Sequence, residues 1–357
     1  MNTIPLTEQI DFSNELNQTL EDYFARGITR AEAVSPYYAQ LWQEMFRLVK
    51  SGGKRLRPKM TILAYQAFGG QDVNSILPIA AAQELLHVSM LIHDDIIDRD
   101  YSRHGVDNVA GSYNKLYESF VTDKTDRLHY AHSAALLAGD LLISGAYHLT
   151  LESKIDPALI IKVQKLLSKS IFEVVGGELI DTESAFRELG AIKSETVALY
   201  KTASYSFVGP LLIGAVLAEI SPDDKANLRL FAECLGIAFQ LRDDIMGVFG
   251  DEAETGKSTT GDIREGKCTY MVEQFYRVAS DEDRSMFDTY FGDQAITSEE
   301  IDVVKRLLVE SGAKDKAEAA IAELEVKASA ALDSLSIESQ YVAQFRTLID
   351  LAIRRNK

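Results

Sequence analysis

Residues 87–98 read HVSMLIHDDIID, and this stretch raises the question of what neutralises its acids. The apolar run VSMLI leads directly into three aspartates, Asp94, Asp95 and Asp98. Burying carboxylates beside leucine and isoleucine is costly unless a cation compensates them. On a helix, Asp94 and Asp98 lie one turn apart on the same face, whereas Asp95 points roughly 100° away. Carboxylates placed this closely repel each other, and their oxygen atoms favour a hard cation such as Mg²⁺.

A second pair of acids supports this interpretation. The stretch AFQLRDDIMGVFGD, residues 238–251, places Asp243 and Asp244 directly after another apolar run. Two acid-bearing helices that are distant in sequence could face each other across the cavity of a helical bundle, as in carboxylate metal sites. Magnesium in proteins usually completes its coordination shell with water and substrate phosphates. The sequence therefore predicts a phosphate-bearing ligand, and the alternative, a solvated acidic patch, is disfavoured by the apolar residues that precede both pairs.

Basic residues are placed where they could meet a diphosphate. In SGGKRLRPK, residues 51–59, Lys54 and Arg57 are three residues apart and can share one face of a helix. Arginine binds phosphate in a bidentate manner and lysine supplies a point charge. Basic runs are usually only solvated, but a concentrated one is less expected in a chain of net charge -17. Further candidate cations are Arg103, Lys201, Lys257 and Lys267.

Composition excludes several classes of protein. The 357 residues include 37 basic and 54 acidic ones, which argues against general binding to nucleic acid. The two cysteines are too few for a disulfide framework and suit a reducing cytosol. The N-terminus lacks the basic start and apolar core of a signal peptide, and the longest apolar run, residues 207–218, is too short to span a bilayer. We expect a cytoplasmic protein without a transmembrane segment.

Helix signals dominate the chain. N-cap residues followed by proline, or a capping box, are found at Asp156-Pro157, Ser221-Pro222 and Thr297 with Glu300. Residues 228–238 repeat apolar positions at steps of three and four, and residues 313–335 are rich in strong helix formers. There is no series of alternating strands and no internal repeat. The sequence predicts an all-α protein in which residues 1–357 form a single-domain helical bundle around a central cavity.

With these acidic and basic motifs, the sequence resembles the trans-isoprenyl diphosphate synthases, also called the polyprenyl synthetase family. The resemblance covers roughly residues 45–300 and follows the order of the family's motifs. Its blocks are GGKRLRP (52–58), HVSMLIHDDIID (87–98), KTASYSFVGP (201–210), FQLRDDI (239–245) and GKSTTGDIREGK (256–267). The resemblance implies an isoprenoid synthase-like fold and a family precedent for homodimers.

The resemblance also implies a role for individual residues. The Mg²⁺ ions that grip an allylic diphosphate would be held by Asp94, Asp98 and Asp243, with Asp95 and Asp244 in supporting roles. That diphosphate would be contacted by Arg103, Lys201, Thr202, Gln240 and Lys257, and Lys267 is a further substrate-binding candidate. The second substrate, isopentenyl diphosphate, would be bound by Lys54, Arg57 and His87. For His87, the simpler alternative is a histidine satisfied within the core.

Members of this family condense isopentenyl diphosphate with dimethylallyl, geranyl or farnesyl diphosphate. Metal ions and cations stabilise the departing diphosphate, and the resulting allylic carbocation is attacked in a dry apolar cavity. Two other functions remain open. A class I terpene cyclase shares the ionisation step but needs no isopentenyl site. A non-catalytic regulatory subunit of a heteromeric prenyl synthase typically lacks the acids of one motif, whereas both acid pairs are present here.

The chain departs from the usual family pattern at several positions. His104 stands where a second arginine is expected to contact isopentenyl diphosphate, and we expect activity to survive with altered pH dependence. Gly247 replaces a third aspartate, which we interpret as tolerated, and Glu178 replaces a common glutamine and receives no role. Residues 108–133 are longer than the family counterpart and are interpreted as a polar surface insertion.

Product length in this family depends on the residues just before the first aspartate. Leu86, Met90 and Asp94 follow one stripe of the helix, and Ser89 lies five positions before Asp94. Bulky aromatic residues at these positions stop elongation early, whereas Ser89 is small and Met90 is flexible. The sequence therefore favours products of geranylgeranyl length or longer over farnesyl.

Overall fold

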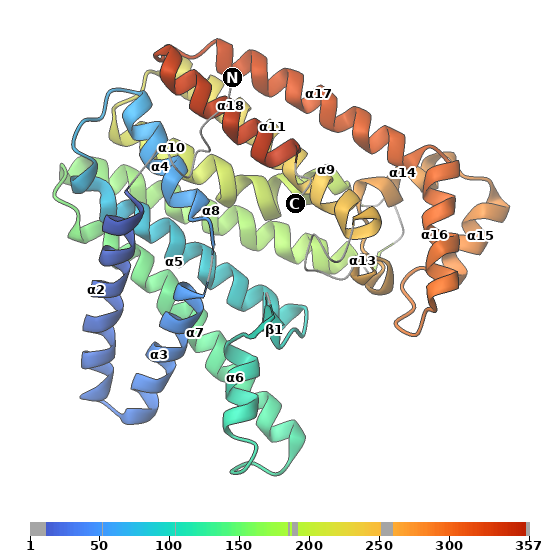
Figure 1. Cartoon of the computed structure of the whole chain (residues 1–357), viewed down its shortest axis with the longest axis horizontal. Coiled ribbons are helices and arrows are strands. Elements are labelled where there is room, and N and C mark those ends of the chain that lie inside the picture. The colour runs from blue at the N-terminus through green and yellow to red at the C-terminus, as the bar shows by residue number, and fades with distance from the viewer. Residues whose placement is uncertain are drawn as a thin grey trace. The chain divides into compact units, whose positions relative to one another are not determined.

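A computed structural model gives the structure of residues 12–51, 53–103, 105–184, 186–187, 192–250 and 260–354. Helices make up most of this part of the chain (Figure 1). The described strands are the two-residue β1 (Ser102–Arg103) and β2 (Val106–Asp107), which pair antiparallel as one small hairpin. The predicted all-α class is confirmed.

The chain divides into two compact units. The first comprises Met1–Lys165 and Ile213–Ala218, and the second comprises Leu166–Leu212 and Glu219–Lys357. Two helices, α8 (Pro157–Ser184) and α10 (Gly209–Leu217), contribute residues to both. The single domain expected from the sequence stays a prediction.

In the first unit, the other helices surround α5 (Val73–Ile97), which packs against α2, α4 and α7 (Figure 1). The bounds of these helices are α2 Ser13–Glu32, α3 Pro36–Lys50, α4 Leu56–Ala67, α6 Val109–Leu116 and α7 Lys124–Glu152. Helix α5 is apolar on most of its faces because neighbours cover it on several sides. Its last turn carries the first group of aspartates, so a helix that is packed on several sides positions them.

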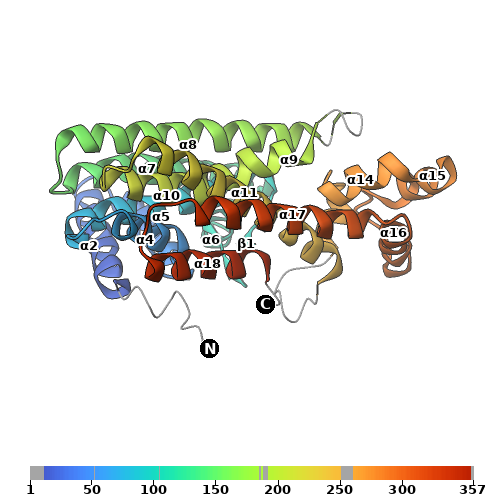
Figure 2. The ribbon, with the colours of Figure 1, turned by 90° about the horizontal axis from the view of Figure 1, so that it is seen from above.

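In the second unit, α11 (Pro222–Phe249) takes the central place and packs against η1 (Ala198–Val208), α17 and α18 (Figure 2). The remaining bounds are α9 Ser194–Val197, α13 Gly261–Glu265, α14 Tyr270–Val278, α15 Asp281–Tyr290, α16 Ser298–Glu310, α17 Ala313–Asp333 and α18 Ser339–Ile353. Leu228, Phe231, Leu235 and Ala238, the apolar repeat found in the sequence, are all buried on α11. This buried face anchors the helix that ends with the second acid pair.

The predicted helix starts are confirmed. Asp156 accepts a bond from the Ala158 backbone N–H at 2.8 Å just before α8, and the Ser221 side chain caps α11. Thr297 and Glu300 form the predicted reciprocal capping box at α16. Local hydrogen bonds between neighbouring residues determine these starts, which is why the sequence predicts them.

Element η1 is a π-helix of 11 residues that carries Lys201 and Thr202. Glycines allow two neighbouring helices to approach it closely. A Cβ on Gly177 of α8 would lie 2.2 Å from the Lys201 backbone nitrogen, and one on Gly236 of α11 would lie 2.4 Å from the Ala203 Cβ. Long π-helical segments are rare and often occur at functional sites. The close packing of α8 and α11 against η1 therefore fixes the positions of the Lys201 and Thr202 side chains.

Residues 108–133, expected to be a polar insertion, are largely helical. They include α6 and the first turns of α7, which pack against each other, with Tyr113 and Ala131 buried. Residues 117–123 connect these two helices. Part of this segment therefore contributes to the core of the first unit.

Two helices, α5 and α7, are long and apolar enough to cross a membrane by length and composition alone, with window hydropathies of 1.5 and 1.3. The protein buries 78% of the apolar window of α5 and 50% of that of α7. Core helices of globular proteins have the same properties, so this is weak evidence for a membrane span. The expected absence of a transmembrane segment stays a prediction.

Candidate active site

The first acid cluster, Asp94, Asp95 and Asp98, lies at the end of α5. The helix ends at Ile97, Asp98 is its C-cap residue, and the Asp98 backbone N–H donates to the Asp94 carbonyl at 2.8 Å. Asp94 and Asp98 are half-buried, whereas Asp95 is only 2% exposed. Two carboxylates of this cluster are therefore partly exposed and one faces the protein interior, and their separate roles stay a prediction.

Arg103, which enters from β1, neutralises part of this cluster. Its Nε donates to Asp95 Oδ1 at 2.9 Å, and its Nη2 lies 2.6 Å from Asp95 Oδ1 and 3.2 Å from Asp94 Oδ2. Burial raises the pKa of Asp95 to about 6 although Arg103 opposes that rise. Burial alone would lower the pKa of Arg103, but the two carboxylates raise it. Arg103 thus remains charged and is held beside Asp94 and Asp95. Its predicted contact with the diphosphate stays a prediction.

The basic block divides into residues with different functions. Arg55 has a left-handed backbone with φ 50°, and its guanidinium bonds to Glu84 and to the Val49 carbonyl. This buried ion pair fixes the turn that leads into α4. Lys54 beside it is exposed, and Arg57 lies half-buried in the first turn of α4. The sequence alone did not distinguish Arg55 as the structural member of the block.

His87 lies on α5, against which α4 packs, so the three candidates for isopentenyl diphosphate belong to adjoining elements of the first unit. His87 is half-buried and makes internal interactions. His87 could therefore be a histidine satisfied within the core, and its role in binding isopentenyl diphosphate stays a prediction. His104 and Lys257, also predicted to bind substrate, lie outside the described residues.

The product-length candidates lie within the packed part of α5. Leu86 is 1% exposed, Ser89 is 0% exposed and Met90 is half-buried. The Ser89 hydroxyl has no hydrogen-bond partner within the described structure. Leu86 and Ser89 are therefore packed inside the first unit, and the role of these residues in product length stays a prediction.

The second acid cluster comprises Asp243 and Asp244 near the end of α11. Three of the predicted residues are joined by hydrogen bonds here. The Thr202 hydroxyl donates to Gln240 Oε1 at 2.6 Å, and Gln240 Nε2 donates to Asp244 Oδ1 at 2.8 Å. This chain connects the π-helix η1 to α11, so residues about forty positions apart in sequence share one polar network.

Asp244 carries a strongly perturbed pKa. Burial, together with the charges of Asp262, Asp243 and Asp181, raises it to about 8, although the hydrogen bond from Gln240 opposes the rise. Several carboxylates therefore gather around the end of α11 with their charges incompletely balanced. A bound cation would relieve this repulsion.

Lys201 is held by two of the surrounding acids. Its Nζ lies 3.0 Å from Glu178 Oε1 and 2.7 Å from Asp181 Oδ2, both on α8. Neither acid was assigned a role from the sequence. The sequence feature that could have indicated them is their spacing of three residues in GGELID, which places both acids on one face of a helix.

Asp262 was also missed by sequence reasoning. A Cβ on Gly247 would lie 2.5 Å from Asp262 Oδ2, so this carboxylate lies beside the position where relatives often carry a third aspartate. Lys267 lies 3.7 Å from Asp262 and 3.0 Å from Glu265. The sequence feature that could have indicated Asp262 is its position between the two lysines of GKSTTGDIREGK.

The donor chemistry of both clusters fits Mg²⁺. Their side chains offer carboxylate oxygens, which Mg²⁺ prefers. Burial raises the pKa of Asp95 and of Asp244, so a bound cation would favour their ionised forms. Across the described ranges, no three acidic, histidine or cysteine side chains are already arranged as a metal site. A cation held here would therefore depend on water or on a ligand to complete its shell, as Mg²⁺ commonly does.

Comparisons with known proteins agree with the motif pattern. The sequence profile described as polyprenyl synthetase matches residues 39–308. A geranylgeranyl diphosphate synthase from Sulfolobus acidocaldarius is 30% identical over 306 residues, which cover 82% of each chain. A short chain isoprenyl diphosphate synthase from Methanocaldococcus jannaschii is 32% identical over 268 residues, covering 73% of this chain and 74% of the relative.

A solved structure gives the same result at the level of the fold. The geranylgeranyl pyrophosphate synthase from Corynebacterium glutamicum, complexed with isoprenyl diphosphate and magnesium, is 28% identical and superimposes with a TM-score of 0.89. The match covers 97% of this chain and 99% of the other. The protein described here belongs to the polyprenyl synthetase family.

Proposed function

We propose that the protein is a trans-isoprenyl diphosphate synthase, a prenyltransferase that condenses isopentenyl diphosphate head-to-tail with an allylic diphosphate. Membership of the polyprenyl synthetase family carries this proposal. Relatives named geranylgeranyl, geranylfarnesyl and short chain isoprenyl diphosphate synthases support it. The product is a linear trans-polyprenyl diphosphate.

The allylic substrate is bound through its diphosphate. Asp94, Asp98 and Asp243 would hold Mg²⁺, which when bound supplies positive charge to the departing diphosphate. Lys201 adds a direct positive charge, and it must exchange at least part of its contact with Glu178 and Asp181 to do so. Arg103, Thr202, Gln240, Lys257 and Lys267 complete this proposed headgroup site.

The second substrate is positioned by separate residues. Lys54, Arg57 and His87 bind the diphosphate of isopentenyl diphosphate so that its double bond can attack the allylic carbon. The protein lowers the barrier mainly by orientation and charge stabilisation rather than by a covalent nucleophile. Packed apolar residues such as Leu86 keep water from the allylic cation.

The two other functions are not favoured. A class I terpene cyclase would not need the isopentenyl residues Lys54, Arg57 and His87. A regulatory subunit would not need both acid clusters, and both are present in this chain, with Asp94 and Asp98 in one and Asp243 in the other. The relatives found here are named as synthases.

Incubation with labelled isopentenyl diphosphate, farnesyl diphosphate and Mg²⁺ tests the proposal. We expect an elongated linear diphosphate, identified by chromatography after dephosphorylation. A cyclic hydrocarbon would instead indicate a cyclase. Failure to turn over unless another chain is added would indicate a regulatory subunit.

We further propose a product of geranylgeranyl length or longer, because Ser89 is small at a position where a bulky aromatic residue would stop the tail. Ser89→Phe should shorten the longest product by about one isoprene unit, and Ser89→Ala should leave the product ladder unchanged. Chromatography of products from both variants checks this. Because Ser89 is fully buried, circular dichroism must first establish that Ser89→Phe is folded. A folded Ser89→Phe variant with an unaltered ladder would remove the assignment.

We also propose that the protein is a cytoplasmic homodimer. Among the large apolar side chains that are exposed in the described structure, four lie on α8, at Ile161, Phe172, Val175 and Leu179. On α8 they recur at helical spacing, so the helix presents an apolar stripe. Such stripes are typical of protein interfaces.

A further inference from the structure

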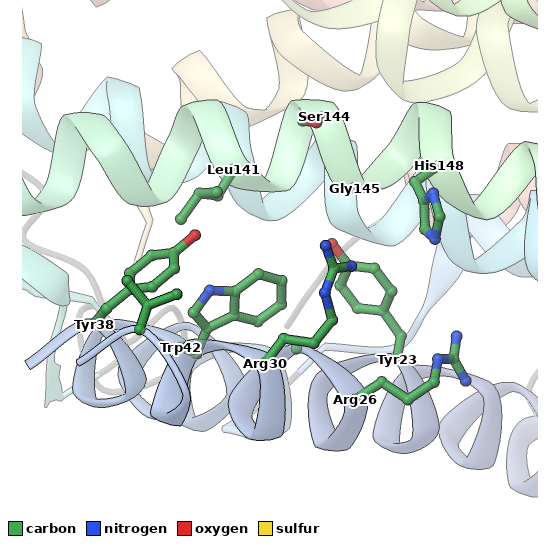
Figure 3. Close-up of a pocket in the computed structure, with 12 residues that line it drawn as sticks. Tyr23, Arg26, Arg30, Tyr38, Trp42, Leu141, Ser144, Gly145 and His148 are labelled. Atoms are coloured by element: carbon green, nitrogen blue, oxygen red, sulfur yellow. The ribbon is translucent and has the colours of Figure 1, made fainter. Parts of the chain in front are cut away.

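A cavity of about 430 Å³ lies in the first unit, between α7 on one side and α2 with the start of α3 on the other (Figure 3). It contains none of the residues assigned to the two diphosphates. Its size falls within the range of pockets that bind small molecules. The walls, the charges and one buried donor together indicate what it binds.

Glycines on both sides give the cavity its aromatic walls. A Cβ on Gly27 would lie 2.1 to 2.7 Å from three atoms of the Trp42 ring, and a Cβ on Gly145 would lie 2.0 Å from the Tyr23 hydroxyl. A side chain at either position would displace the ring beside it. Val34 and Leu141 add aliphatic surface to the lining. The cavity can therefore enclose an apolar body.

The lining is positively charged although the chain as a whole is acidic. It includes Arg26, Arg30 and His148, and none of the residues that line the cavity is acidic. Glu152 binds Arg26 with both oxygens at 2.7 Å and lies 3.2 Å from His148, so the charge of Arg26 is balanced. Arg30 has no such partner in the described structure, and its guanidinium extends from α2 toward α7 (Figure 3). The charge of Arg30 is therefore available to an anion.

The indole of Trp42 supplies an unused donor. Its Nε1 is buried and has no hydrogen-bond partner among the described residues. The ring nitrogen faces the side of the cavity where Tyr38 and Leu141 lie (Figure 3). An unsatisfied buried donor costs about 1–3 kcal/mol, and a ligand acceptor that reached Nε1 after a small rotation of the ring would recover part of this cost.

We infer that this cavity is a second ligand site, which binds an amphipathic anion whose phosphate or carboxylate head pairs with Arg30 and whose apolar body lies against Trp42. The inference is independent of the proposed catalytic function. Prenyl phosphates and fatty acids share this chemistry. Arg26, whose charge Glu152 balances, and His148 offer polar groups near the head.

Trp42 is the only tryptophan of the chain, so its fluorescence reports directly on the cavity. We would titrate the full-length protein in EDTA with farnesyl monophosphate, decanoate or inorganic diphosphate. EDTA removes the divalent ions on which the proposed headgroup site depends. We expect a saturable change in emission with farnesyl monophosphate, with decanoate or with both. The compound that causes the change shows which charged group and which apolar chain the cavity prefers.

Variants separate this site from other effects. Arg30→Ala should weaken binding roughly tenfold or more, because it removes a charge-assisted contact. Arg306→Ala, which removes an exposed arginine of α16, should not change binding. Ser144→Phe should fill the cavity and abolish the response, whereas Ser144→Ala should preserve it. No saturable response with either amphipathic anion, a response to inorganic diphosphate alone, or equal binding by Arg30→Ala would overturn the inference.

Discussion

Lys201 illustrates how single residues could set substrate affinity in this protein. Its ammonium group is held by Glu178 and Asp181, although its proposed partner is a diphosphate. A substrate must therefore compete with two carboxylates for one cation. Glutamine, common at position 178 in this family, would compete less because it is neutral.

Glu178→Gln should consequently lower the KM for the allylic diphosphate about two- to fivefold, with little change in kcat. The removal of one carboxylate from a partly buried ion pair frees Lys201 for phosphate. Steady-state kinetics at saturating isopentenyl diphosphate measure the effect. Thr182→Ala, a change at an exposed position on the same helix, serves as the control. An unchanged or higher KM in Glu178→Gln would show that the pair does not restrain Lys201.

Asp244 should make the metal-free protein less stable as the pH rises. Its pKa is about 8 in the folded chain and near 3.8 when unfolded, so between these values the folded state binds a proton that the unfolded state does not. The free energy of unfolding therefore falls as the pH increases through this window. Asp95, with a pKa of about 6, adds to the fall only in its lower part.

Calorimetry in EDTA between pH 6 and pH 8.5 isolates the contribution of Asp244. We expect the wild-type protein to lose on the order of 2 kcal/mol over this range and Asp244→Asn to lose less. Mg²⁺ should reduce the difference, because a cation stabilises the ionised form. Identical pH profiles for the two proteins would contradict the assignment of this pKa to Asp244.

Among the elements, the π-helix η1 depends on glycines in its neighbours. Gly177→Ala would bring a methyl group within 2.2 Å of the Lys201 backbone nitrogen, so the helices must separate. We expect a loss of about 1–3 kcal/mol in the free energy of unfolding and a reduced kcat, because Lys201 and Thr202 move with η1.

The adjacent residue provides a matched control. A Cβ on Gly176 meets no atom within 4 Å, and alanine favours helix over glycine by about 0.5–1 kcal/mol. Gly176→Ala should therefore be as stable as the wild-type protein or more stable. Denaturant unfolding of both variants tests the pair, and equal stability would argue against the close approach of α8 and η1.

The sequence predicts those elements whose signals are local. The capping box of Thr297 and Glu300 and the proline after Ser221 involve neighbouring residues, and both helices begin as predicted. The order of the motifs likewise predicted the family. The π-helix could not be predicted, because it depends on close packing against α8 and α11 rather than on its own residues.

Side-chain partners are harder to predict than elements. Both Arg55 and Lys54 belong to the basic block, but only the fold brings Glu84 to Arg55. Asp262 lies beside Gly247 although fifteen positions separate them in sequence. A change at Gly247 therefore has to be interpreted together with Asp262, which no periodicity in the sequence indicates.

At the scale of the whole molecule, the apolar stripe on α8 should mediate self-association. Phe172 is 80% exposed, and its ring would be buried in a dimer. Phe172→Glu should convert the dimer to a monomer at micromolar concentration, because a charge would enter the interface. Val326→Glu changes an apolar side chain on α17 that is 69% exposed and should leave the dimer intact. Sedimentation velocity measures both, and a monomeric wild-type protein would remove the proposal.

The central claim is that the acids at the ends of α5 and α11 bind one allylic diphosphate through divalent ions. The most direct test is a crystal grown with Mn²⁺ and farnesyl thiolodiphosphate, which resists ionisation, with the metals located by anomalous scattering. The account predicts metal ions bound by Asp94 and Asp98 and by Asp243, all coordinated to the same diphosphate. Metal ions bound by only one of these clusters, or a diphosphate bound away from both, would contradict it.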